Sequence, residues 1–97
     1  MSLLAVISKA RSFRLSLSRD LLDKVRKEMG EGKSSRAHLV VALENEAGRL
    51  GLSWERYTEL LEKAVVKRDR GGDLSAKEQD MLTTFEAILR ILCLNLS

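Results

Sequence analysis

No proline interrupts this sequence of 97 residues, and its glycines fall in three short breaks. Proline lacks the backbone amide that an α-helix needs and clashes with the preceding turn, so its absence leaves long helices available. The breaks lie at Gly30–Gly32, Gly48–Gly51 and Gly71–Gly72. Glycine commonly ends a helix because it adopts the left-handed conformation at little cost. The sequence therefore predicts helical segments separated at these three places.

A serine precedes each predicted helical segment and can cap its first turn. The capping residues are Ser18, Ser34 or Ser35, Ser53 and Ser75. Ser75 and Glu78 also have the spacing of a capping box. Apolar residues recur at helical spacing after each cap. We therefore expect a mainly α protein with about four helices, forming a single domain over residues 1–97.

The hydrophobic period changes to two between Ser12 and Ser18. Three apolar residues alternate there with three polar residues: Phe13, Leu15 and Leu17 against Ser12, Arg14 and Ser16. Alternation over seven residues is typical of a half-buried β-strand. The sequence thus predicts one short N-terminal strand before the helices. The alternative is an all-α helical bundle, in which this segment is a connector or the first turn of a long helix.

One strand followed by two helices resembles the ribbon-helix-helix family of DNA-binding proteins, the Arc, MetJ and CopG type. The resemblance covers residues 11–46. It is carried by Phe13–Val25, Gly32–Ala37 and Val41–Asn45. It implies a ribbon-helix-helix-like core over residues 11–48. Residues 52–97 would then be a helical C-terminal extension for oligomerisation or partner binding.

The resemblance also implies how such a protein would bind double-stranded DNA. In the family, two chains pair their strands into a ribbon that enters the major groove. The base-contacting residues would be Ser12, Arg14 and Ser16, on the polar face of the strand. The phosphate-contacting residues would be Lys33, Ser34 and Ser35, at the start of the following helix.

A homodimer is expected on physical grounds as well. A lone strand cannot satisfy its own backbone hydrogen bonds, and a chain this short gains stability by associating. Phe13, Leu15 and Leu17 would form the strand part of the interface. Leu43 would join them, because it lies on a broad apolar stripe that predicts a helix buried on most sides.

The last predicted helix is apolar nearly all round from Ile88 to Leu96. At about 100° per residue, these side chains cannot all face one core. We expect Phe85, Leu89 and Leu92 to pack on their own chain. Ile91 and Leu94 would then pack on another chain, either a second copy or a partner protein.

Charge is unevenly distributed along the chain. Residues 1–36 carry nine Lys or Arg against four Asp or Glu, whereas residues 37–97 carry eight against ten. A basic N-terminal third indicates an anionic partner, most commonly nucleic acid. We therefore predict a sequence-specific DNA-binding protein, either a small transcriptional repressor or a plasmid or phage accessory factor. The alternative is a helical protein–protein interaction module, such as an adaptor or antitoxin-like subunit; helical RNA binding is a third interpretation.

Other classes of function find little support in the composition. The single histidine, His38, and the single cysteine, Cys93, cannot make a zinc site without a cluster of carboxylates. We expect no metal, no cofactor and no enzymatic activity, and no membrane partner because no apolar run is long enough to span a bilayer. A cytoplasmic location is expected. The Ser-, Leu- and Arg-rich start of the chain leaves mitochondrial targeting as an alternative.

Overall fold

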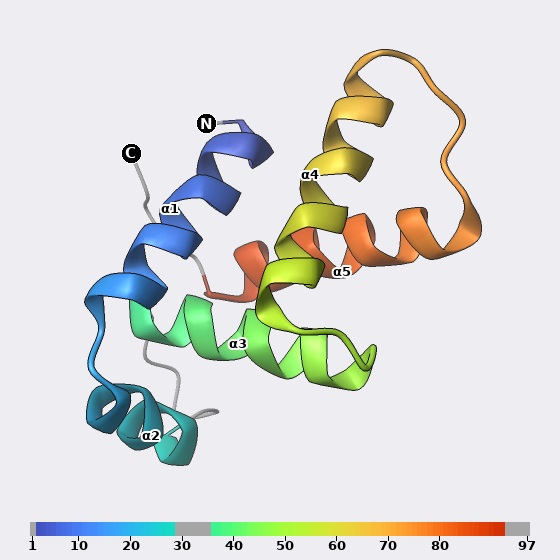
Figure 1. Cartoon of the computed structure of the whole chain (residues 1–97). Coiled ribbons are helices and arrows are strands. Elements are labelled where there is room, and N and C mark those ends of the chain that lie inside the picture. The colour runs from blue at the N-terminus through green and yellow to red at the C-terminus, as the bar shows by residue number, and fades with distance from the viewer. Residues whose placement is uncertain (1, 29–35, 93–97) are drawn as a thin grey trace.

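The computed structural model describes residues 2–28 and 36–92, and this part of the chain is mainly α-helical. Its five helices are α1 (Leu3–Ser16), α2 (Arg19–Glu28), α3 (Arg36–Arg49), α4 (Trp54–Asp69) and α5 (Ala76–Leu92) (Figure 1). None of the described helices combines the length and the apolar character that a bilayer crossing requires.

The predicted N-terminal strand is wrong, because residues 12–16 lie within α1 and the described residues contain no strand. A helical stripe determines the structure here. Val6, Ile7 and Ala10 are buried, and Phe13 and Leu17 pack against the same core. Leu15 does not belong to that stripe, and 86% of its surface is exposed. A two-residue step turns a helix by about 200°, so Phe13 and Leu15 cannot share a face. The fold agrees with the all-α alternative.

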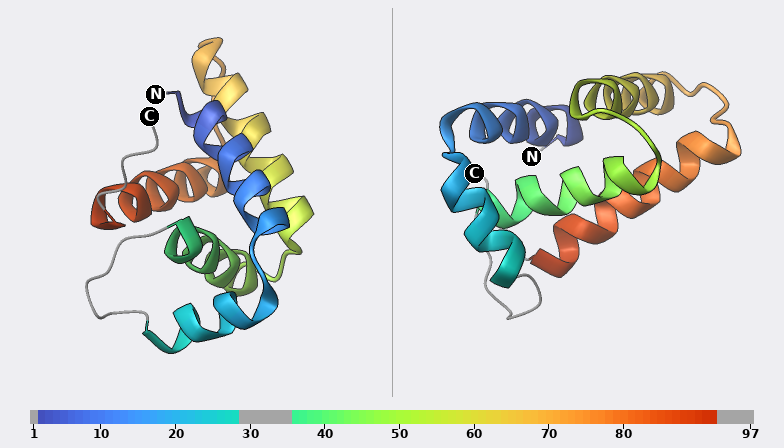
Figure 2. Two further views of the ribbon diagram at one scale, coloured as in Figure 1. Left: turned by 90° about the vertical axis from the view of Figure 1, so that its left-hand side faces the viewer. Right: turned by 60° about the horizontal axis from the view of Figure 1, so that its bottom comes forward.

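α3 is the central helix of the molecule. It packs against each of the other four described helices, and it lies in the middle of both views in Figure 2. Leu39, Val40, Val41 and Leu43 are fully buried along it. The broad apolar stripe that we associated with a dimer centre is therefore covered within a single chain.

α1 and α4 lie side by side and run in opposite directions (Figure 1). Arg11 contacts Thr58 and Glu62, whereas Arg14, one turn later in α1, contacts Glu55 at the start of α4. α2 differs from the other helices because it packs on α3 alone among the described helices. Its buried side chains there are Leu22 and Val25.

The predicted caps of the last two helices are confirmed. The Ser53 hydroxyl accepts a hydrogen bond from the Arg56 amide at 3.1 Å. Ser75 and Glu78 form the expected capping box: the Glu78 amide donates to the Ser75 hydroxyl at 3.1 Å, and the Ser75 amide donates to the Glu78 carboxylate at 2.9 Å. These bonds satisfy amides that the first helical turn leaves without partners.

Candidate functional site

The residues predicted to contact DNA bases do not form one surface. Ser12 and Ser16 are exposed, and the Ser16 hydroxyl donates to the Phe13 carbonyl at 3.1 Å. Arg14 is half-buried and extends toward α4. The predicted phosphate contacts, Lys33, Ser34 and Ser35, lie outside the described residues.

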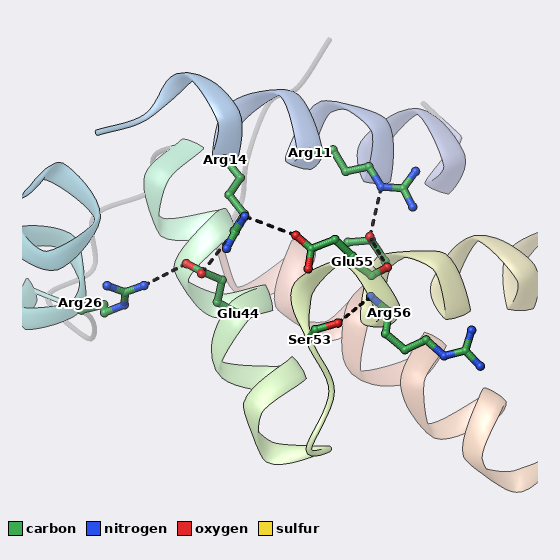
Figure 3. Close-up of polar contacts among 8 residues, drawn as sticks. Arg11, Arg14, Arg26, Glu44, Ser53, Glu55 and Arg56 are labelled. Carbon is green, nitrogen blue, oxygen red and sulfur yellow. Dashed lines mark hydrogen bonds and ion pairs between the residues drawn. The ribbon is translucent and has the colours of Figure 1, made fainter. Parts of the chain in front are cut away.

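Arg14 is the centre of a polar network that joins three helices (Figure 3). Its Nε lies 3.4 Å from a carboxylate oxygen of Glu44 in α3. One terminal nitrogen lies 4.0 Å from the carboxylate of Glu55 in α4. The guanidinium carbon is also 5.2 Å from the centroid of the Trp54 ring. This side chain therefore makes two charge contacts and a cation–π contact within its own chain.

Glu44 extends the network to α2. Its other carboxylate oxygen accepts a hydrogen bond from Arg26 at 3.1 Å (Figure 3). The Glu44 side chain is only 19% exposed, and a carboxylate with so little contact with water needs paired cations nearby. One acid thus connects the arginines of α1 and α2 to the central helix.

Arg11, one turn before Arg14 in α1, also contacts α4. Its Nε donates to the Thr58 hydroxyl at 3.1 Å, and a terminal nitrogen pairs with Glu62. Three of the basic residues in the N-terminal third, Arg11, Arg14 and Arg26, are therefore paired with acids of α3 and α4. The charge asymmetry of the sequence is partly neutralised inside the fold.

A groove lies between α1 and α4 and encloses about 350 Å³. We call it the α1–α4 groove, and it is lined by Arg11, Arg14, Leu15, Trp54, Glu55, Thr58 and Glu59. Leu15 contributes an exposed apolar side chain, whereas Trp54 is largely buried. The arginines come from α1 and the glutamates from α4, so the two walls carry opposite charge.

The acids of the groove differ in their pairing. Glu59 lies 2.9 Å from Arg56 and 3.1 Å from Lys63. The ammonium of Lys63 lowers the pKa of Glu59, chiefly through a hydrogen bond to its carboxylate. Glu55 is 78% exposed, and its contact with Arg14 is long at 4.0 Å. Glu55 is therefore the acid in the groove that is more available to a ligand.

The predicted interface residues fall into two groups. Phe13 and Leu17 are partly buried and pack against the core, and Leu43 is only 1% exposed, so all three contact the core of their own chain. The Arg36 guanidinium also lies 5.0 Å from the centroid of the Phe13 ring. Leu15 and Ile91, by contrast, are 86% and 79% exposed. Leu94 lies outside the described residues.

α5 divides its apolar residues between two faces, as predicted. Phe85 is fully buried, and Leu89 and Leu92 pack against the core. Ile91 lies on the outer face. Whether a second chain covers Ile91 stays a prediction.

Sequence reasoning missed Glu44, Trp54 and Glu55 as members of one site. Trp54 is at helical spacing with Tyr57 and Leu61, a position that indicates a core residue, and it is buried. Glu55 and Glu59 are four residues apart and have Arg56 and Lys63 near them in the sequence, a pattern typical of a solvated helix face and not of a groove. The signal that identifies the site is the pairing of α1 with α4, and this pairing depends on residues 12–16 being helical.

The described residues contain no group of three or more His, Cys, Asp or Glu side chains arranged to hold a metal ion.

In comparisons with known proteins, no family model, no curated protein and no solved structure matches this chain.

Proposed function

We propose that this protein is a helical protein–protein interaction module that binds its partner through the α1–α4 groove. The observation that carries the proposal is Leu15, which is 86% exposed and lines the groove beside Trp54. Single exposed leucines are common on protein surfaces. Leu15 differs because it borders a concave site with an aromatic ring and charged groups, a combination that favours protein binding.

The charges around Leu15 also favour a protein ligand over a polyanion. Arg11 and Arg14 are already paired with Glu62 and Glu44, so binding a phosphate through them would require breaking these contacts. Glu55 and Glu59 would repel a phosphate backbone. An amphipathic protein surface can bury Leu15 and match both signs of charge.

Nucleic-acid binding is the second candidate function, and one observation favours it. Arg19, Lys24 and Lys27 are exposed on α2, and none of the three lines the α1–α4 groove. Together they are a small basic surface that phosphates could contact, and such binding would weaken steeply with salt. Asp20 and Asp23 lie on the same helix and reduce its net positive charge.

A photo-crosslinking experiment separates the two functions. Benzoylphenylalanine would replace Leu15 in the full chain, with the same residue at Thr83, an exposed position on α5, as the matched control. We expect position 15 to give an adduct that survives nuclease and that mass spectrometry identifies as two crosslinked peptides. Adding Glu55→Arg should reduce that adduct. Adducts that nuclease removes, or no adduct above the Thr83 control, would contradict the proposal.

A further inference from the structure

We propose that the occupant of the α1–α4 groove is a second copy of this chain, related to the first by a two-fold axis that runs along the groove. This inference rests on the proposed function and names its partner. In this arrangement α1 of each copy lies over α4 of the other. Each Arg14 then faces the other copy's Glu55, and each Leu15 covers the groove beside the other copy's Trp54.

α1 and α4 run in opposite directions along the groove, and each α1 arginine that lines it lies at the same height along the groove axis as the α4 residue that it contacts. Arg14 and Glu55 face each other across it at 4.0 Å. Arg11 faces Thr58 at 3.1 Å, one turn farther along. A two-fold rotation about an axis along the groove places α1 of one copy over α4 of the other. The rotation does not change the height of any residue along that axis. Arg14 of one copy therefore meets Glu55 of the other at the same height, and Arg11 meets Thr58.

Self-complementary charge distinguishes this surface from an ordinary charged patch. A patch of one sign repels its own copy, whereas an isologous interface needs a surface that is complementary to itself. The groove meets that condition because Arg11 and Arg14 lie on one wall and Glu55 and Glu59 lie on the other. Glu55 has a long contact with its own Arg14, so it can approach a second arginine without losing a close partner.

Leu15 supplies the apolar part of the interface. It is the most exposed of the large apolar side chains in the described residues, and the two-fold arrangement removes it from water in both copies at once. Arg14 is a residue type that often dominates binding energy when it lies near the centre of an interface, and Trp54, which is 8% exposed, lies beside it in the lining of the groove. The polar groups around them would form its rim.

Sedimentation equilibrium of the purified full chain tests this proposal. We expect a reversible monomer–dimer equilibrium that shifts toward monomer as salt is added, because the paired charges become screened. Leu15→Ser should weaken the dimer by about ten-fold or more, since two leucines lose their burial. Glu55→Arg should also weaken it, by placing a cation opposite the other copy's Arg14. The comparison variant is Ile91→Ser, because the sequence predicts that Ile91 packs on another chain and it therefore marks the competing surface. It removes a similarly exposed apolar side chain from α5, and on this proposal it leaves the dimer intact.

Circular dichroism would verify that each variant keeps the helical content of the parent chain. The proposal is overturned if the chain is monomeric at every concentration, or if Ile91→Ser dissociates the dimer while Leu15→Ser does not. A monomeric chain that still forms a groove-dependent protein adduct from position 15 would reject the second copy as occupant and retain the interaction module. A monomeric chain that also gives no adduct from position 15 would reject both the second copy as occupant and the interaction module.

Discussion

The Nε of Arg14 lies 3.4 Å from the carboxylate of Glu44, a residue thirty positions later in the chain. This contact converts a basic residue of the N-terminal third into part of the internal packing of α1 on α3. Arg26 reaches the same carboxylate from α2. Glu44 therefore helps to hold three helices together, and the arginines around it are less available to an external anion.

Removing the Arg14 side chain should lower the stability of the fold. Arg14→Ala loses the contacts with Glu44 and Glu55 and the stacking on Trp54. We expect a decrease of about 1–2 kcal/mol in the free energy of unfolding, because a half-exposed pair and a cation–π contact are each worth a modest amount. Arg19→Ala, on the exposed surface of α2, should change it by less than about 0.5 kcal/mol. Urea denaturation compares the two variants, and equal effects would argue against a structural role for Arg14.

Leu43 tests whether the central helix belongs to the core of one chain. Leu43→Ala should reduce the free energy of unfolding by about 2–5 kcal/mol, because Leu43 is 1% exposed and its removal leaves a cavity. Leu15→Ala is the matched control, with the same substitution at an exposed site. It should have little effect on stability at concentrations at which the chain is monomeric. A Leu43 variant as stable as the Leu15 variant would show that α3 is not the centre of the fold.

Two glycines that lie three residues apart should respond to alanine in opposite ways. Gly51 has a φ of 71°, and it follows α3 where the Leu52 amide donates to the Ala47 carbonyl at 2.9 Å. Alanine strains this left-handed conformation, so Gly51→Ala should destabilise the fold by about 1 kcal/mol. Gly48 lies within α3 and a Cβ there meets no atom within 4 Å. Gly48→Ala should stabilise by about 0.5–1 kcal/mol. Thermal unfolding of both variants measures the difference, and shifts of the same sign would contradict it.

The capping box predicts a component of the acid sensitivity. The Ser75 amide and then Lys67 lower the pKa of Glu78. A carboxylate with a depressed pKa contributes stability above its ordinary pKa, and this contribution is lost as the pH falls through the depressed value. Glu78→Gln should therefore unfold with a weaker dependence on pH in the acid range. Parallel pH profiles for the variant and the parent chain would contradict this assignment.

The sequence predicted those features that depend on neighbouring residues. The caps at Ser53 and Ser75 and the division of α5 between Leu89 and Ile91 follow from local spacing, and the structure has them. The error at residues 12–16 arose because Phe13, Leu15 and Leu17 alternate over too short a stretch to show which period governs. Val6 and Ala10 extend a helical stripe through Phe13 and Leu17, and this longer stripe determines the structure.

The α1–α4 groove could not be predicted from local patterns. It depends on which helices pair and in which direction, and the residues in contact, such as Arg14 and Glu55, are far apart in the sequence. Leu15 shows the same limitation. In a strand it would be an inward-facing residue, whereas in α1 it becomes an exposed residue of the groove. Because a strand was predicted where the chain forms a helix, the sequence analysis missed both the helical packing of this segment and the groove that it lines.

Fluorescence of Trp54 gives the most direct test that the α1–α4 groove is the assembly surface. Trp54 is the only tryptophan in the chain, and it lies in the groove beside Arg14. When the purified protein is diluted, its emission should change with a midpoint equal to the dissociation constant from sedimentation, and Leu15→Ser should move this midpoint to a higher concentration by the same factor by which it weakens the dimer. An emission spectrum that stays constant while sedimentation shows dissociation would contradict the account, because assembly would then occur at another surface.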